Sequence, residues 1–134
     1  ELKKETMLLL GNGHCFRDHV LEVCPEFARF SSDTEGIRKS FEGSSLETIK
    51  HMVAAGMGIT LVPRLSVPKG AMETKKRRGD EPFVKYLPVQ DGKLPPPTRR
   101  IVLAWRRSFT RYEAIAALRN AIYACELPGV TRLS

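Results

Sequence analysis

The sequence has 134 residues, about the length of one domain, because a single hydrophobic core usually serves roughly 100–200 residues. Hydrophobic residues make up 42% of the chain and charged residues 28%, a balance that excludes a disordered tail and a fibrous protein. No apolar run approaches the roughly 18–20 residues of a membrane span. The first residue is Glu1 and no signal peptide opens the chain, so we expect a fragment or processed product of a cytoplasmic protein, without membrane contact.

The net charge of +7 comes from one part of the chain. Between Lys69 and Arg111 there are twelve Lys or Arg residues against four Asp or Glu, and the remainder sums to −1. The four consecutive basic residues at 75–78, beside Gly79 and Asp80, are typical of a solvent-exposed loop. A phosphate-contacting patch within the loop at 69–80 is the alternative. No aromatic residue interleaves with the run, so the pattern does not indicate stacking on bases.

Short apolar runs predict strands that alternate with helices. The runs cover residues 7–10, 37–41, 59–62, 83–89 and 101–105. Three consecutive prolines at 95–97 predict a stiff connector and a domain boundary before the last run. Alternating strands and helices with short connections are typical of parallel strands in an α/β fold. No glycine-rich phosphate loop of the Gly-x-Gly-x-x-Gly or Walker type is present.

The first amphipathic segment predicts a helix that begins with Asn12 as its N-cap and ends before Pro25. Its apolar side would carry Phe16, Val20, Val23 and Phe27.

The second helix is predicted to begin at a capping box. In it the Ser44 hydroxyl accepts from the Glu47 amide, and the Glu47 carboxylate reaches back to the cap. Gly56 in the left-handed conformation would end this helix. A last helix is predicted from Tyr112 to Ile122, because its apolar residues are three or four apart.

The three cysteines are an odd number and too few for the disulfide framework of a secreted protein. We therefore expect a reducing compartment, in which a disulfide would be transient and regulatory. His14, Cys15, His19 and Cys24 could in principle bind zinc, but their spacing fits no zinc-finger pattern. We expect no metal and no other cofactor.

A short segment around Cys15 carries the chemistry. Behind a cap at Asn12, Cys15 would lie in the first helical turn, where the backbone amides and the helix dipole favour a thiolate. His14 and Arg17 would add positive or polarising partners, whereas Asp18 would oppose them. A thiolate attacks peroxide to give a sulfenic acid, which a second thiol converts to a disulfide. The alternative is that the cysteines are small buried apolar residues without reactivity.

Cys24 is the natural second thiol by its place in the sequence. It lies nine positions after Cys15, which along a helix corresponds to about 13.5 Å of rise and about 900° of rotation, half a turn out of phase. A disulfide requires Cα atoms within roughly 7 Å, so the two cannot bond while the helix persists. Oxidation would therefore require the segment to unwind, which is the behaviour of a switch and not of an enzyme cycle.

Three stretches of the chain together match one protein family. They are Leu9-Leu10-x-x-Gly13-His14-Cys15-x-Arg17-Asp18 with Cys24 nine residues on; Ser45-Leu46-Glu47-Thr48 and the later Gly56-x-Gly58-Ile59-Thr60-Leu61-x-Pro63; and Arg99-x-Ile101-x-Leu103 before Arg111-Tyr112-Glu113. These stretches resemble the OxyR family, the hydrogen-peroxide-sensing LysR-type transcription regulators. The resemblance covers roughly residues 7–122.

The resemblance implies a periplasmic-binding-protein-like α/β fold, as in LysR-type effector domains, that is incomplete here. Residues 1–97 would be most of effector subdomain II, with a redox segment at 12–30. Residues 98–134 would be the C-terminal segment of effector subdomain I. The DNA-binding helix-turn-helix domain would be absent, so this chain would not read DNA sequence by itself.

The resemblance also implies the roles of individual residues. The peroxide-reactive cysteine corresponds to Cys15 and the resolving cysteine to Cys24, with His14 and Asp18 lining the reactive pocket. A distant arginine that stabilises the thiolate corresponds to Arg99, or to Arg100 if the alignment shifts by one. Cys125 has no family role.

The implied partners are hydrogen peroxide, further copies in a homodimer or homotetramer, DNA through the absent domain, RNA polymerase, and a thiol reductant that resets the switch. We accordingly expect a regulator and not an enzyme. Two alternatives stay open: a LysR-type sensor of a small organic ligand with incidental cysteines, and a thiol peroxidase.

Overall fold

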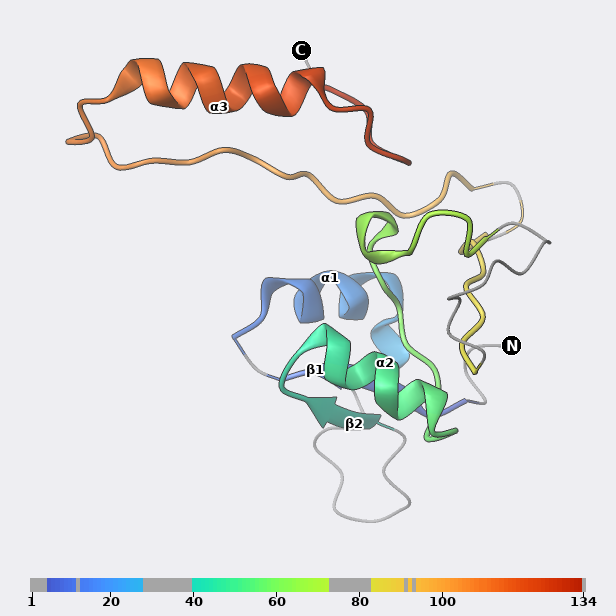
Figure 1. Cartoon of the computed structure of the whole chain (residues 1–134). Helices are drawn as coiled ribbons and strands as arrows, with labels where there is room; N and C mark the ends of the chain where they lie inside the picture. Colours follow the sequence, from blue (N-terminus) through green and yellow to red (C-terminus); the bar gives the residue numbers. More distant parts are fainter. Residues whose placement is uncertain are drawn as a thin grey trace. The chain divides into compact units, whose positions relative to one another are not determined.

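The structure, a computed structural model, describes residues 5–11, 13–27, 40–72, 83–90, 92 and 94–133. The chain divides into two units, Glu1–Pro97 and Thr98–Ser134. The division falls directly after the three consecutive prolines. Figure 1 shows the elements of both units in chain order.

Two short parallel strands form the centre of the first unit. Strand β1 (Met7–Leu10) pairs with strand β2 (Ser40–Gly43), in a register that places Met7 beside Ser40 and Leu10 beside Gly43. The prediction of a strand at 37–41 was therefore right about a strand but placed it too early, and residues 37–39 lie outside the described part. All four residues of β1 are buried, as expected for a strand covered on both faces.

The other edge of β1 is covered by a single parallel bridge. Ile59 lies beside Met7, its amide donates to the Thr6 carbonyl at 2.9 Å, and the Leu8 amide donates to the Ile59 carbonyl at 2.8 Å. The predicted strand at 59–62 is thus reduced to one bridging residue. Gly58 permits this approach, because a Cβ at that position would collide with the Thr6 carbonyl.

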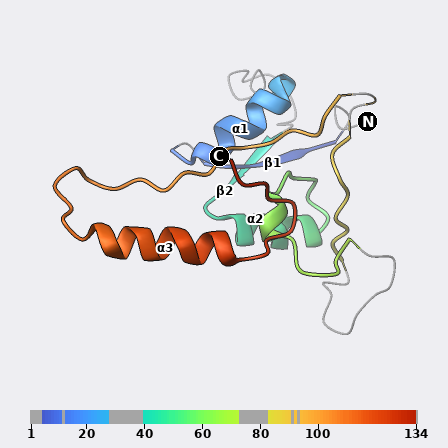
Figure 2. The same cartoon turned by 90° about the horizontal axis from the view of Figure 1, so that it is seen from above.

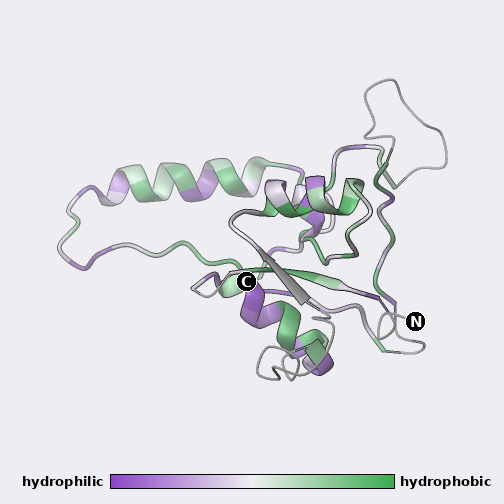
Figure 3. Ribbon diagram, turned by 90° about the horizontal axis from the view of Figure 1, so that it is seen from below, coloured by the Kyte–Doolittle hydropathy of each residue, from purple (hydrophilic) through white to green (hydrophobic). Residues whose placement is uncertain are grey.

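Helix α1 (Cys15–Val23) and helix α2 (Leu46–Ala54) cover opposite faces of the strands, as Figures 2 and 3 show. Alternate residues of β1 serve the two sides, because successive side chains of a strand point to opposite faces. On the α1 side the buried cluster consists of Met7, Leu9, Val20, Cys24 and Phe27. On the α2 side it consists of Leu8, Leu10 and Ile49. The first unit is therefore a small α/β/α sandwich.

The first helix begins later than the sequence predicts. Its N-cap is His14, not Asn12, and Cys15 is the first helical residue instead of the third. The His14 side chain makes no capping hydrogen bond. Val23 is 41% exposed, so it does not belong to the buried side on which Val20 lies.

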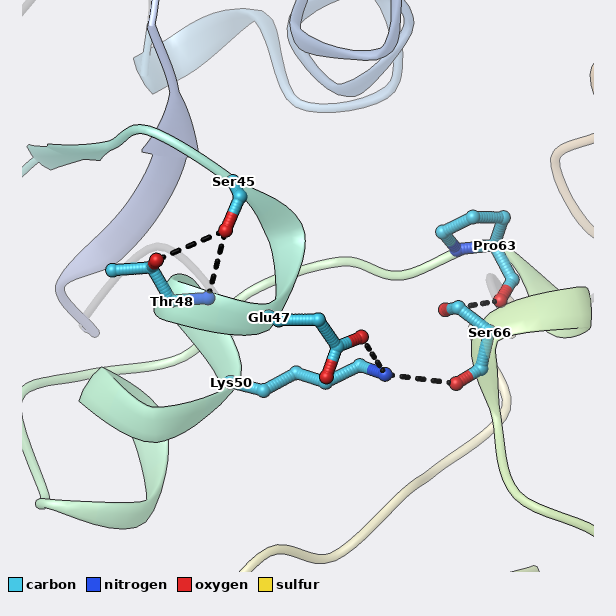
Figure 4. A network of polar contacts seen from close by, with 6 residues as sticks. All are labelled: Ser45, Glu47, Thr48, Lys50, Pro63 and Ser66. Carbon is cyan, nitrogen blue, oxygen red and sulfur yellow. Dashed lines mark hydrogen bonds and ion pairs between the residues drawn. The ribbon is translucent and has the colours of Figure 1, made fainter.

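The second helix is capped at both ends. Its N-cap lies one residue after the predicted one. Ser45, not Ser44, is the N-cap, and its Oγ accepts from the Thr48 amide at 3.1 Å (Figure 4). The Glu47 carboxylate does not complete a capping box; it accepts from Lys50 at 2.9 Å. At the other end Gly56 has φ +80°, as predicted.

The hydrogen bonds around Gly56 form a Schellman motif. The Gly56 amide donates to the Val53 carbonyl at 2.9 Å, and the Met57 amide donates to the Met52 carbonyl at 3.1 Å. The last carbonyls of α2 are therefore satisfied by backbone donors.

The second unit is an extended segment followed by helix α3 (Tyr112–Ala124), which confirms the predicted last helix. The predicted strands at 83–89 and 101–105 are absent, since residues 83–90 and 98–105 form no strand pairing with any described residue. No residue between 98 and 133 is buried, and apolar side chains of α3 such as Leu118 stay half exposed. The expectation of a buried strand there was wrong. Within the described ranges no helix is long and apolar enough to cross a membrane.

Candidate functional site

Cys15 is an exposed thiol at the first residue of α1. At a helix N-terminus the first backbone N–H groups have no carbonyl partner within the helix, and the helix dipole adds partial positive charge. Both effects favour an anion at this position. Although the cap differs from the predicted one, Cys15 therefore keeps the first-turn position on which its expected reactivity depends.

His14 and Asp18 lie within one turn of Cys15, and both are exposed. In the described part of the chain no hydrogen bond joins the three side chains, so they are neighbours along the helix without a fixed network. The predicted thiolate-stabilising Arg99 is half-buried and belongs to the second unit. Its contact with Cys15 stays a prediction.

Cys24 has the opposite surroundings from Cys15. It is the C-cap residue of α1, its amide donates to the Val20 carbonyl at 2.9 Å, and its side chain is only 4% exposed. Burial raises the pKa of the Cys24 thiol, and the nearby carboxylate of Glu26 raises it further. Cys24 is therefore held as a neutral thiol at physiological pH, out of reach of a solvent oxidant.

Both cysteines are free, and they lie at opposite ends of α1. A helix places residues nine apart at about 13.5 Å along its axis and half a turn out of phase, which is far beyond the roughly 7 Å limit for a disulfide. The same separation contradicts the zinc alternative, which needs Cys15 and Cys24 on one ion. Within the described residues no group of three or more His, Cys, Asp or Glu lies close enough to hold a metal.

Arg17 occupies a place that sequence reasoning missed. It was expected to act on Cys15 by its charge, but it is 8% exposed and its Nη1 donates to the Leu10 carbonyl at 2.7 Å. The bond joins the first turn of α1 to the end of β1. A spacing signal was available, because Arg17 lies three residues before Val20 and seven before Cys24, on the buried side of the helix.

The remaining candidates lie apart from this segment. Cys125 is exposed at the C-cap of α3, where its Sγ donates to the Ala121 carbonyl at 3.2 Å. His19 is partly buried, and its Nδ1 is enclosed without a hydrogen-bond partner among the described residues. The basic run at 75–78 lies outside the described residues.

Residues 1–124 match the family described as the LysR substrate binding domain. The chain belongs to that family. A LysR effector domain has the periplasmic-binding-protein-like α/β fold, so the predicted fold class is confirmed. The α/β/α sandwich of the first unit is the part of this fold that holds both Cys15 and Cys24.

Curated relatives of this LysR domain include peroxide-response regulators. The hydrogen peroxide-inducible genes activator of Pectobacterium carotovorum subsp. carotovorum is 40% identical over 119 residues, which are 87% of this chain and 34% of the relative. The DNA-binding transcriptional dual regulator OxyR of Escherichia coli K12 is 41% identical over 119 residues, which are 87% of this chain and 33% of the relative. The chain therefore spans about a third of the length of these relatives. The predicted resemblance to the OxyR family is confirmed.

Two solved structures resemble the LysR domain described here. A reduced form of OxyR from Neisseria meningitidis has a TM-score of 0.73 and 34% identity, and the match covers 99% of this chain and 56% of that one. The reduced form of the OxyR regulatory domain from Pseudomonas aeruginosa has a TM-score of 0.60 and 38% identity, and covers 92% of this chain and 51% of that one.

Proposed function

We propose that this chain is the hydrogen-peroxide-sensing part of a LysR-type transcription activator, with Cys15 as the peroxide-reactive thiol and Cys24 as the resolving thiol. The observation that carries the proposal is the contrast between the two sulfurs: one is exposed at a helix N-terminus, and the other is buried in the core at the far end of the same helix. The names of the relatives support the oxidant, because they are activators of hydrogen peroxide-inducible genes.

The chemistry balances with peroxide as the only oxidant. The Cys15 thiolate attacks one peroxide oxygen, the O–O bond breaks, and the second oxygen leaves as hydroxide and takes up a proton to become water. The Cys24 sulfur then attacks the sulfenic sulfur, the S–O bond breaks, and the leaving hydroxyl takes the Cys24 proton. Two thiols and one peroxide become one disulfide and two waters. A thiol reductant reverses the change.

The second step requires α1 to unwind. While α1 persists, its geometry holds Cys24 far from Cys15, and the burial of Cys24 keeps it from a second peroxide molecule. Formation of the disulfide therefore refolds the redox segment at 12–30, of which residues 12 and 28–30 lie outside the described part. Because the sulfenic acid cannot be resolved without this change, oxidation of one atom is converted into a conformational signal.

Around the sulfur, His14 and Asp18 would line the peroxide pocket and Arg99 would stabilise the thiolate. Residues 1–97 would form most of effector subdomain II and residues 98–134 the return segment of subdomain I. The lack of any buried residue among the described residues of 98–133 supports the second assignment, since a return segment would bury its apolar side chains against the rest of that subdomain. The whole regulator would act in the reducing cytoplasm.

The output of the switch would be a change in assembly. Refolding would alter contacts in a homodimer or homotetramer, and so change how a helix-turn-helix domain in the whole regulator binds DNA and recruits RNA polymerase. In this role the chain is a regulator and not an enzyme, because one peroxide molecule sets the switch once per reduction.

The test is peptide mapping of the chain after stoichiometric hydrogen peroxide, without reductant. We expect one linked peptide pair that joins Cys15 to Cys24. In Cys15→Ser the linked pair should be absent, and loss of peroxide should fall to the rate of a free thiol. In Cys24→Ser we expect Cys15 to accumulate as sulfenic acid. Cys125→Ser is the matched control, and its disulfide should form as in the parent chain.

Three results would contradict the proposal. A disulfide from Cys15 to Cys125 would make the resolving assignment wrong. Unchanged thiols at stoichiometric peroxide would favour a LysR-type sensor of a small organic ligand with incidental cysteines. Sustained peroxide turnover with a thiol reductant, many equivalents for each chain, would favour a thiol peroxidase.

A further inference from the structure

Arg17 is a buried cation that joins the switching helix to the sheet. Its guanidinium Nη1 donates to the Leu10 carbonyl at 2.7 Å, and both residues are at most 8% exposed. Leu10 is the last residue of β1, whereas Arg17 lies in the first turn of α1, two residues after Cys15. The bond therefore spans the β1–α1 connection and holds the start of the helix against the strand.

The short distance and the burial make this contact stronger than an average surface hydrogen bond. A charged donor gives a shorter and stronger bond than a neutral one. Breaking the bond without replacement would leave the buried Leu10 carbonyl without this donor, and an unsatisfied buried carbonyl costs more free energy than the bond itself contributes in water. The bond is therefore kept while the first turn of α1 persists and is lost when that turn unwinds.

We propose that Arg17 is a positioning residue that holds α1 in its helical form in the reduced protein, and that it thereby sets the reduction potential of the Cys15–Cys24 pair. This inference rests on the proposed function, because it needs a disulfide between these two cysteines. In this role Arg17 acts through the helix that carries the two cysteines and not through the chemistry at either sulfur. It acts on the free energy that separates the helical reduced state from the unwound oxidised state.

The direction of the effect follows from linkage. The Arg17–Leu10 bond stabilises the reduced state and is lost when the first turn unwinds, so it opposes disulfide formation. Removing it destabilises the reduced state alone. The disulfide then becomes harder to reduce, and the reduction potential becomes more negative.

Lys50 provides a matched control in the same unit. It is also a buried cation, 7% exposed, and its Nζ donates to the Ser66 carbonyl at 3.0 Å and to the Glu47 carboxylate at 2.9 Å (Figure 4). It joins α2 to the turn Arg64–Ser66 and lies outside the segment between the two cysteines. Losing Lys50 should lower the stability of the fold without favouring the oxidised state over the reduced one.

The experiment measures the fraction of Cys15–Cys24 disulfide in glutathione buffers for Arg17→Gln, Arg17→Lys, Lys50→Gln and the parent chain, all with Cys125→Ser. For Arg17→Gln we expect the disulfide to be favoured about tenfold, which is about 30 mV for a two-electron couple. Arg17→Lys keeps the positive charge on a shorter side chain, so its reduction potential should shift less than that of Arg17→Gln. Lys50→Gln should match the parent chain. Amide exchange of the reduced proteins should be faster in α1 for both Arg17 variants and in α2 for Lys50→Gln.

Other outcomes would contradict either the inference about Arg17 or the proposed function. An unchanged potential in both Arg17 variants, with the disulfide present, overturns the inference and leaves the proposed function standing. Equal shifts in the Arg17 and Lys50 variants also overturn it, because they would reflect general loss of stability. If Arg17→Gln does not fold, the reduction potential and the amide exchange rates of Arg17→Lys test the inference. If the parent chain forms no Cys15–Cys24 disulfide, the proposed function fails and the inference fails with it.

Discussion

Helices α1 and α2 are the same length, nine residues each, and cover opposite faces of the same strands, but they end differently. α2 has a serine N-cap whose hydroxyl accepts from the Thr48 amide, and a Schellman motif at Gly56. α1 has His14 as its N-cap without a side-chain bond, and its C-cap is Cys24, which is not in the left-handed conformation. Helix α2 is therefore capped at both ends, whereas α1 is held mainly by its packing in the core and by the Arg17–Leu10 hydrogen bond.

The difference in capping indicates which of the two helices unwinds more readily. End caps contribute about 1 kcal/mol each to a helix, largely independent of the core. A helix without them depends on its packing, so it unwinds once a competing bond outweighs that packing. The uncapped helix is the one with a cysteine at each end. Of the two helices that pack on the sheet, the one with fewer end caps is thus the one that the proposed switch unwinds.

The largest expected effect is the loss of stability when a buried side chain is removed from the core on the α1 side or on the α2 side of the sheet. Phe27 is 1% exposed beside Cys24, and Ile49 is 1% exposed on the α2 side. Phe27→Ala should lower the free energy of unfolding of the reduced chain by about 3–5 kcal/mol and Ile49→Ala by about 2–5 kcal/mol. After oxidation the Phe27→Ala effect should shrink, because the redox segment has left its place, whereas the Ile49→Ala effect should persist. Urea unfolding of both redox forms measures this, and equal persistence at both sites would break the comparison.

A smaller contrast concerns the N-caps. Ser45→Ala should lower the free energy of unfolding by about 1 kcal/mol, because the Thr48 amide loses its acceptor. His14→Ser gives α1 the cap that it lacks and should favour the reduced state by a similar amount, which makes the disulfide easier to reduce by several-fold in glutathione buffers. His14→Ala controls for loss of the imidazole and should not have this effect. If His14→Ala matches His14→Ser, the missing cap is not the cause.

The smallest contrast concerns pH. The pKa of Cys24 is raised by burial and by Glu26, so the folded chain binds the thiol proton more tightly than the unfolded chain. The stability from this effect is complete below the thiol pKa of the unfolded chain and is lost as pH rises through the raised value. Above the ordinary thiol pKa of about 8.5, the free energy of unfolding should therefore fall more steeply with pH in the reduced parent chain than in Cys24→Ala. Parallel curves for the two proteins would contradict this expectation.

Much of the first unit could be predicted from the sequence, and the errors have physical causes. The apolar run of β1 and the glycine after α2 identified their elements, because burial and a left-handed end have direct signatures in residue type. The two N-caps were displaced because Ser44 and Ser45 offer the same hydroxyl, and because the backbone between Gly11 and Cys15 decides where a helix starts. The prediction of strands at 83–89 and 101–105 was wrong, since a strand needs a hydrogen-bonded neighbour and an apolar run does not specify one.

For the candidate site, the sequence predicted that Cys15 and Cys24 lie far apart along one helix, and the structure places them at its two ends, since position along a helix follows from residue spacing. It did not predict that Cys24 would be buried while Cys15 stays exposed, or that Arg17 would be buried and donate to the Leu10 carbonyl. These facts depend on which helix face packs on β1, and that face is set by the whole core. Arg99 stays a prediction, because its place relative to Cys15 depends on contacts beyond its own unit.

The bridge at Ile59 has a consequence for how the protein behaves in concentrated solution. An apolar strand with an open edge is a template for pairing with other chains and so for aggregation. All four residues of β1 are apolar, but β2 lies along one edge and Ile59 covers the start of the other, an approach that only glycine at position 58 allows. Cleavage between Gly56 and Ile59 would uncover that edge of β1 and should increase aggregation of the chain.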